Sequence, residues 1–187
     1  EHVVIFDKQA VDDWTDTADN FHEHRAIIYA RNQSFYIAQE LGLKYFLMLD
    51  DDYTGLDHRY IESGKLKAKR VVQLDRLFED MIRFLEDSNA LTIAFCQAGD
   101  FIGGADGKRF KEKVVRKAMN SFFCRADRPF QFVGTMNEDV TMYTTLGSRG
   151  ELIMSITDCV IIQKATQSTR GGMSEAYADG GTFLKSF

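Results

Sequence analysis

The chain has 187 residues, of which 44% are hydrophobic and 12% aromatic, and a formal net charge of −5. This length is in the range of one domain, and the apolar content can fill a sizeable core. The acidic balance excludes a general attraction to nucleic acid or to an anionic membrane. No apolar run approaches the roughly 20 residues of a membrane-spanning helix, so we expect a soluble protein with no membrane partner.

The first half of the chain alternates apolar runs of strand length with segments of helical spacing. Residues 3–6 and 45–49 are predicted to be buried strands. Ser34 can cap a helix over residues 35–41 that stops at Gly42. From residue 70 to residue 87 the apolar side chains keep helical spacing, which predicts an amphipathic helix that packs on a sheet.

The second half continues the alternation. Strands are predicted over residues 91–96, 121–124, 130–133 and 152–162, the last interrupted near Asp158, and a glycine-rich stretch follows the first of them. Asn137 can cap a helix over residues 138–146 that ends at Gly147. This order predicts an α/β domain with a mostly parallel central sheet flanked by helices. In such sheets ligands collect at the carboxyl ends of the strands.

One domain over residues 1–187 is the simplest organisation, because the chain has no repeat and no linker. Residue 1 is glutamate and an apolar run begins at residue 3, so we expect sequence upstream, and the domain can lack its first strand and its C-terminal end. The three cysteines, Cys96, Cys124 and Cys159, are widely spaced among apolar neighbours. That pattern favours buried, reduced thiols in a cytoplasmic protein over a disulfide framework or a zinc site.

Three adjacent carboxylates, Asp50, Asp51 and Asp52, follow directly after the predicted strand 45–49. Neighbouring carboxylates raise one another's pKa unless a cation or strong donors compensate. Oxygen ligands suit Mg²⁺ or Mn²⁺, which use one or two carboxylates and leave positions for substrate phosphates. The triplet therefore indicates a site for a divalent cation and a diphosphate, against the alternative of an acidic turn.

Two further polar pairs are ambiguous when each is taken alone. Arg31 and Asn32 could hold a diphosphate or a nucleotide, or form a loop salt bridge and a cap. Glu138 and Asp139 begin a predicted helix, where the helix dipole favours carboxylates without any catalytic role.

Together these pairs resemble a known series. The strings ARN (30–32), LMLDDD (47–52) and NED (137–139) resemble the arginine-asparagine, DxD and xED motifs of inverting GT-A glycosyltransferases. Longer strings, YFLMLDDDY (45–53), IAF (93–95), GDFIGG (99–104), KAMNSFFC (117–124), RPFQFVG (128–134), TQ (166–167) and GGM (171–173), resemble the TET-associated glycosyltransferases of phages. That domain is in turn similar to the C-terminal domain of the vertebrate growth-regulating oestrogen-receptor-binding proteins.

The resemblance implies a role for each matching residue. Asp50 and Asp52 would face the metal, Mn²⁺ or Mg²⁺. The donor, a UDP-linked or similar nucleotide-diphosphate sugar, would be bound by Arg31, Asn32, Asp50, Asp51, Gly103 and Gly104. Asp139, with Glu138 beside it, would take the proton from the acceptor hydroxyl in an inverting displacement.

The family association with TET dioxygenases implies 5-hydroxymethylcytosine in DNA as the acceptor, with the base flipped out of the stack. A phage-encoded chain would act in the cytoplasm of the host. GT-A enzymes commonly add a late histidine as a metal ligand, but only His58 follows the acidic triplet here. The third ligand is then water or a residue beyond Phe187.

Two basic clusters, Lys65, Lys67, Lys69 and Arg70, and Lys108, Arg109, Lys111, Lys113, Arg116 and Lys117, could contact the phosphates of such DNA, or simply face solvent. The segment LMLDDDYT (47–54) also fits the DxDxT pattern of aspartyl-phosphate phosphatases. Asp50 would then be a nucleophile, and Asp100 together with Asp106 would imitate the late acidic motif of that family. A third possibility is a module that binds a nucleotide sugar or DNA without turnover.

Overall fold

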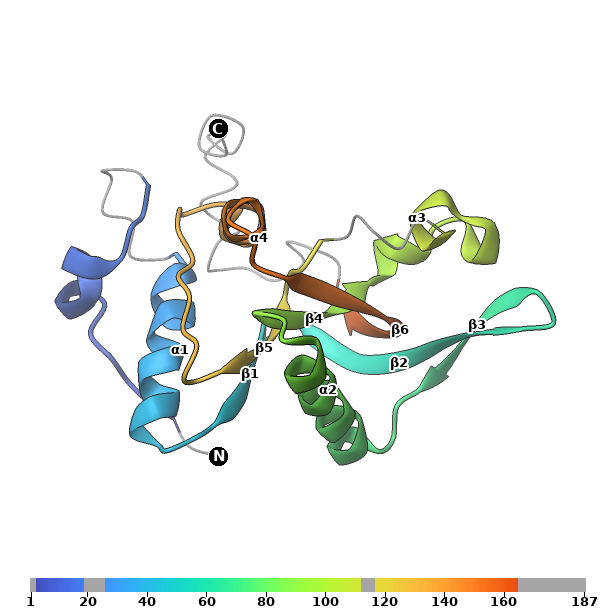
Figure 1. The fold of residues 1–187 in the computed structure, drawn as a ribbon, viewed down its shortest axis with the longest axis horizontal. Helices are drawn as coiled ribbons and strands as arrows, with labels where there is room; N and C mark the ends of the chain where they lie inside the picture. Colours follow the sequence, from blue (N-terminus) through green and yellow to red (C-terminus); the bar gives the residue numbers. More distant parts are fainter. Residues whose placement is uncertain (1–2, 19–25, 112–116, 165–187) are drawn as a thin grey trace.

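A computed structural model describes residues 3–18, 26–111 and 117–164, and shows an α/β domain built on one six-stranded sheet (Figure 1). The strands lie in the order β1-β5-β4-β6-β2-β3. Their bounds are β1 (Tyr45–Leu49), β2 (Tyr53–Glu62), β3 (Lys65–Arg70), β4 (Thr92–Gln97), β5 (Ser121–Arg125) and β6 (Ile153–Gln163). The α/β class and the four strands predicted near residues 45, 91, 121 and 152 are confirmed.

The prediction of a mostly parallel sheet is wrong. Only β4 and β6 pair in parallel, while β1–β5, β4–β5, β2–β6 and β2–β3 are all antiparallel. Two connections explain the difference. The chain passes directly from β2 into β3 through a hairpin, and β5 inserts between β1 and β4 in the opposite direction to both. The predicted interruption near Asp158 corresponds to a register shift, because Phe95 faces Ile156 whereas Cys96 faces Val160.

The helices cover both faces of the sheet. They comprise η1 (Gln9–Trp14), α1 (Ile28–Glu40), α2 (Leu74–Ser88), η2 (Ala98–Phe101), η3 (Gly104–Asp106), α3 (Lys108–Lys111) and α4 (Glu138–Ser148), where η denotes a 3₁₀ helix. None of the helices in the described ranges is both long and apolar enough to cross a membrane. The helix predicted over residues 70–87 is α2, which ends where Asn89 takes a left-handed conformation.

Alternating side chains of the strands build apolar clusters on the two faces of the sheet, as the period of two in a strand requires. Phe122 and Cys124 of β5 face the core formed with α1 and α4, whereas Phe123 faces the core formed with α2. Cys96, Cys124 and Cys159 are all buried thiols outside any disulfide, as predicted. Burial raises the pKa of Cys159 to about 12 and raises that of Cys124 further.

Three local predictions are corrected. The helix expected over residues 35–41 begins at Ile28, so Ser34 is not its cap but lies inside α1, where its hydroxyl donates to the carbonyl oxygen of Ala30 (2.7 Å). Residues 3–6 form no strand, and Val3, Val4 and Ile5, which were expected to be buried, are exposed. Residues 130–133 are irregular, because the side chain of Asn32 takes both backbone hydrogen bonds of Phe132.

The hairpin of β2 and β3 was not predicted. Ser63 and Gly64 form its two-residue turn, both with positive φ (50° and 74°), between the paired residues Glu62 and Lys65. The hairpin extends on the side of the molecule opposite α1 (Figure 1). It therefore carries the first basic cluster away from α1.

Candidate donor and catalytic site

The guanidinium of Arg31 is the centre of a charged cluster where α1, β1 and α4 meet. Its Nη1 lies 2.5 Å from Oε1 of Glu138, and its Nη2 lies 3.0 Å from Oδ1 of Asp50. The guanidinium carbon lies 5.3 Å from the ring centre of Phe122 and 5.1 Å from that of Phe132. Arg31 is only 6% exposed, so the two carboxylates and the two rings hold it in a fixed position.

The structure thus brings together three residues that are 19 and 107 positions apart in the sequence. Asp50 follows the last residue of β1, and Glu138 is the first residue of α4. Arg31 lies in the second turn of α1 and not in a loop, because that helix begins earlier than predicted. A pocket of about 250 Å³ adjoins the cluster, lined by Arg31, Asp50, Asn120 and the apolar residues of β1.

The cluster holds more negative than positive charge. Burial is the main cause that raises the pKa of Asp50, and the carboxylates of Asp52 and Asp139 raise it further, while Arg31 opposes the shift. The pKa of Glu138 is likewise raised, first by burial, against the opposing effect of Arg31. Four carboxylates therefore act on one another around one guanidinium, which is an environment that attracts a cation.

Asp139 is buried in the first turn of α4, next to Glu138. Its Oδ1 accepts a hydrogen bond from the backbone N–H of Val140 (2.8 Å), and its Oδ2 has no hydrogen-bond partner among the described residues. One turn further along, the pKa of Tyr143 is raised by burial and then by the charge of Asp139. Asp139 therefore has one oxygen fixed by the backbone and one oxygen available to accept a proton.

Asp52 is held by a chain of side-chain amides that no sequence pattern indicated directly. Gln163 Nε2 donates to Asp52 Oδ1 (3.1 Å), and Asn120 Nδ2 donates to Gln163 Oε1 (2.8 Å). The backbone N–H of Asp50 donates to the carbonyl oxygen of Asn120 (3.3 Å). The one sequence signal was Asn120 itself, just before a buried strand, in one of the strings that carry the family resemblance.

The other predicted site residues do not contact the charged cluster directly. Asn32 does not face the acidic residues, because its amide binds the backbone of Phe132 (3.0 and 2.8 Å). Asp51 is exposed. Gly103 and Gly104 lie at the start of η3, which packs mainly with β3 and α3. The structure thus brings Arg31 to Asp50, but does not bring the two glycines there.

The described ranges contain no group of three or more His, Cys, Asp or Glu side chains arranged to hold a metal ion. His58 is exposed within β2, opposite Lys69, and about 20 Å along the strand from Asp52. The carboxylates of Asp50 and Asp52 each use one oxygen in a hydrogen bond, to Arg31 and to Gln163. Their other oxygens suit a cation that takes its remaining ligands from a diphosphate and from water.

Comparison with known protein families identifies a match over most of the chain. The family model of the TET-associated glycosyltransferases matches residues 1–172. Comparison with curated proteins and with solved structures gave no significant match, so the GT-A type of the fold stays a prediction. The matched range includes Arg31, Asp50 and Glu138 of the charged cluster. The chain therefore belongs to the TET-associated glycosyltransferase family.

Proposed function

We propose that the chain transfers a sugar from a nucleotide-diphosphate sugar, UDP-linked in the simplest case, to a hydroxyl group with inversion at the anomeric carbon. The observation that carries this proposal is the convergence of Arg31, Asp50 and Glu138 beside Asp139. Family membership supports a glycosyltransferase. The single guanidinium among four carboxylates supports a donor site at the end of β1.

The donor diphosphate would bind over Asp50 and Asp52, beside the guanidinium of Arg31. The diphosphate is negative, and the cluster already carries an excess of carboxylates, so a further positive charge is needed. Mn²⁺ or Mg²⁺ held by Asp50 and Asp52 would supply that charge and stabilise the leaving diphosphate. Arg31 would keep Asp50 in position and add a fixed positive charge near the phosphates.

Asp139 would be the general base. As the acceptor oxygen forms its bond to the anomeric carbon, the bond from that carbon to the diphosphate oxygen breaks, and the hydroxyl proton passes to Oδ2 of Asp139. The backbone N–H of Val140 would keep Oδ1 in place during the transfer. Glu138 is engaged by Arg31, so its part would be to position the guanidinium.

The acceptor would be 5-hydroxymethylcytosine in DNA, as the family resemblance implies. Lys65, Lys67 and Lys69 are exposed, alternate along β3 and so share one face of the hairpin. None of the three makes an ion pair with another described residue. Lys67 lies opposite Tyr60 and Lys69 opposite His58, so this face combines positive charge with aromatic rings. Such a face suits the phosphates of a nucleic acid, although the chain is acidic overall.

The phosphatase alternative is less well supported. It needs Asp50 as an unengaged nucleophile and a late acidic residue nearby. Asp50 is instead paired with Arg31, and Asp106 lies in an exposed ion pair with Lys111 (2.8 Å).

The test is sugar transfer to hydroxymethylated DNA, read as the mass of the product, with unmodified DNA as the control acceptor. Asp139→Asn keeps the shape and the Oδ1 hydrogen bond but removes the proton acceptor. Single-turnover transfer should therefore fall roughly 10²- to 10⁴-fold while donor affinity is unchanged. Glu138→Gln should weaken donor binding more than it slows transfer.

If Asp139→Asn transfers sugar at nearly the rate of the parent protein, the general base is another residue. Phosphate trapped on Asp50 would favour the phosphatase instead. Donor and DNA binding without any product, in the parent protein, would indicate a binding module.

A further inference from the structure

A second pocket, of about 330 Å³, lies on the flank of α1 that faces away from Asp50. Phe35 and Phe130 line it and are buried, only 2% and 7% exposed. Trp14 and Tyr36 form one wall, with their ring centres 4.7 Å apart and their planes at 79°. Both of these rings are partly exposed, 39% and 44%, so a ligand can reach them from solvent.

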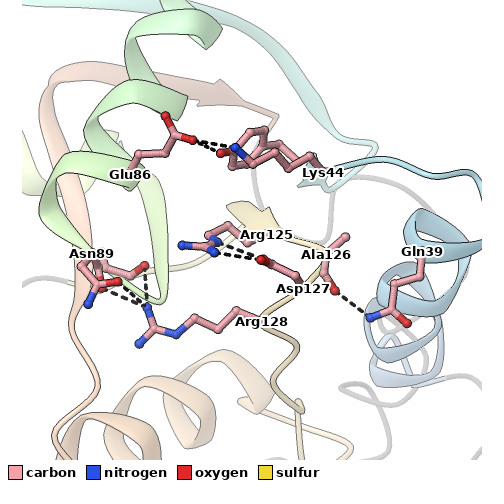
Figure 2. Close-up of polar contacts among 10 residues, drawn as sticks. Gln39, Lys44, Glu86, Asn89, Arg125, Ala126, Asp127 and Arg128 are labelled. Carbon is pink, nitrogen blue, oxygen red and sulfur yellow. Dashed lines mark hydrogen bonds and ion pairs between the residues drawn. The ribbon is translucent and has the colours of Figure 1, made fainter.

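The walls of this aromatic pocket are fixed by contacts on both sides. The hydroxyl of Tyr29, a fully buried residue of α1, donates to Oδ1 of Asp12 (2.6 Å) and so anchors η1, which carries Trp14. On the other side, Gln39 Nε2 donates to the carbonyl oxygen of Ala126 (2.6 Å), and Arg128 reaches the carbonyl oxygen of Asn89 (3.0 Å), as Figure 2 shows. The segment that follows, with Pro129 and Phe130, is therefore held in place before any ligand binds.

The lining restricts the chemistry of the ligand. None of the described residues that line the aromatic pocket carries a charge, so the enclosed part of the ligand is neutral. Its polar groups are the carboxamides of Asn32, Gln39 and Gln131, and that of Gln131 has no hydrogen-bond partner among the described residues. A carboxamide offers a donor beside an acceptor, which matches the edge of a nucleobase. The volume is at the lower limit of small-molecule pockets, which suits one ring system.

The aromatic pocket is connected to the charged cluster. Asn32 lines the pocket, and its carboxamide holds the backbone of Phe132, whose ring lies against the guanidinium of Arg31. The rings of Phe130 and Phe132 are in contact, with centres 5.4 Å apart. The two sites lie on different flanks of α1 and share this packed segment, so a change in one can reach the other through Asn32 and Phe132.

We infer that the aromatic pocket binds an unpaired nucleobase, which stacks on one ring of the Trp14–Tyr36 pair, has its edge toward the other, and is hydrogen-bonded by Gln131. The inference rests on the proposed function, because a glycosyltransferase that modifies DNA handles two sources of nucleobases. One is the nucleotide of the donor and the other is the nucleic-acid strand of the acceptor. Stacking on aromatic rings accepts every base, so the binding should be tolerant of sequence.

The chain provides its own probe, because Trp14 is its only tryptophan. Its fluorescence would be titrated, with a chelator present, by a short single-stranded oligodeoxycytidylate, by UDP and by glucose. Saturable quenching by the oligonucleotide alone would assign the aromatic pocket to the acceptor strand. Quenching by UDP as well would assign it to the base of the donor. Either result supports a nucleobase site.

Tyr36→Ala removes one of the two rings that contact the base. The affinity for the ligand that quenches Trp14 should therefore fall roughly 5- to 150-fold. Phe84→Ala is the matched control, since Phe84 is similarly exposed (39%) but lies on α2 and not in the aromatic pocket. Gln131→Ala should weaken binding less than Tyr36→Ala. Circular dichroism would confirm that each variant is folded.

Unchanged Trp14 fluorescence with both the oligonucleotide and UDP would overturn the inference. So would quenching by glucose alone, or equal affinity in Tyr36→Ala and Phe84→Ala. The measurement needs no turnover and no metal. Normal quenching without sugar transfer would therefore refute the proposed function and leave the nucleobase site intact. Sugar transfer without quenching would refute the nucleobase site and leave the proposed function intact.

Discussion

The cluster around Arg31 and the hairpin of β2 and β3 use charge in opposite ways. Arg31 is 6% exposed, and each end of its guanidinium is engaged by a carboxylate from another element. Lys67 and Lys69 of the hairpin are exposed and make no ion pair with a described residue. The cluster around Arg31 fixes its charges before a ligand arrives, but its charged groups lose contact with water. The hairpin leaves its charges accessible, so phosphates can use them without breaking an internal ion pair.

The largest effect is expected when the buried charge is removed. Arg31→Met would leave the carboxylates of Asp50 and Glu138 partly buried without their partner, which should cost about 3 to 5 kcal/mol of the free energy of unfolding. Urea unfolding measures this. Arg83→Met is the control, because Arg83 pairs with Asp80 on the surface and its effect should be within the error of the measurement. Equal destabilisation of both variants would show that burial of Arg31 does not matter.

The pH dependence of the Arg31→Met variant should show where its destabilisation originates. Burial already raises the pKa values of Asp50 and Glu138, and removing the guanidinium would raise them further. The folded state would then bind protons that the unfolded state releases, so lower pH favours folding. The difference from the parent protein should shrink as the pH falls from neutrality toward the ordinary carboxyl pKa of about 4. A constant difference in chelator-treated protein would contradict this origin.

A smaller loss of stability is expected when Asn32, which holds Phe132 against Arg31, is replaced. Asn32→Ala removes both hydrogen bonds to the backbone of Phe132, a fully buried residue, and should cost about 1 to 3 kcal/mol of the free energy of unfolding. Because Phe132 lies against Arg31, donor affinity should fall as well. Calorimetric titration with the donor measures the second effect. Normal donor affinity in a destabilised Asn32→Ala protein would limit Asn32 to a role in folding.

Removing two lysine charges from the hairpin should have the smallest effect on stability. It should, however, clearly weaken DNA binding. Lys67→Gln combined with Lys69→Gln should leave the unfolding transition unchanged. The slope of log affinity against log salt for duplex DNA should fall by about 0.9 for each lysine that binds a phosphate in the parent protein. Arg76→Gln combined with Arg83→Gln changes the net charge equally but lies on α2. If both pairs change the slope alike, only net charge matters and the hairpin is not the contact surface.

Local patterns predicted most of the elements, and long-range contacts account for most of the errors. The apolar runs located β1 and β4, and helical spacing located α2. The direction of β5 could not be predicted, because a strand that is buried on both faces has the same pattern in either direction. Residues 130–133 have the alternation of a strand, but the amide of Asn32, 100 positions away, takes the place of a neighbouring strand.

The candidate site was predicted in part for the same reason. Asp50 was identified from its place after a buried strand, whereas Glu138 was identified only through the family resemblance, and the structure brings both to Arg31. Gln163 gave no signal, since its contact with Asp52 exists only because β6 pairs with β2. The hairpin, by contrast, could have been predicted, because Ser63 and Gly64 are typical residues of a two-residue turn between strands.

The two edge strands of the sheet, β1 and β3, should differ in how readily they pair with a strand of another molecule. β3, at one edge, carries lysines at alternate positions, which discourage another strand from pairing with it. β1, at the other edge, has the sequence YFLML without any charge, and no described strand pairs with its outer side. Self-association by strand addition would therefore begin at β1. Charged substitutions in this five-residue edge are therefore expected to reduce self-association more than changes in the basic hairpin.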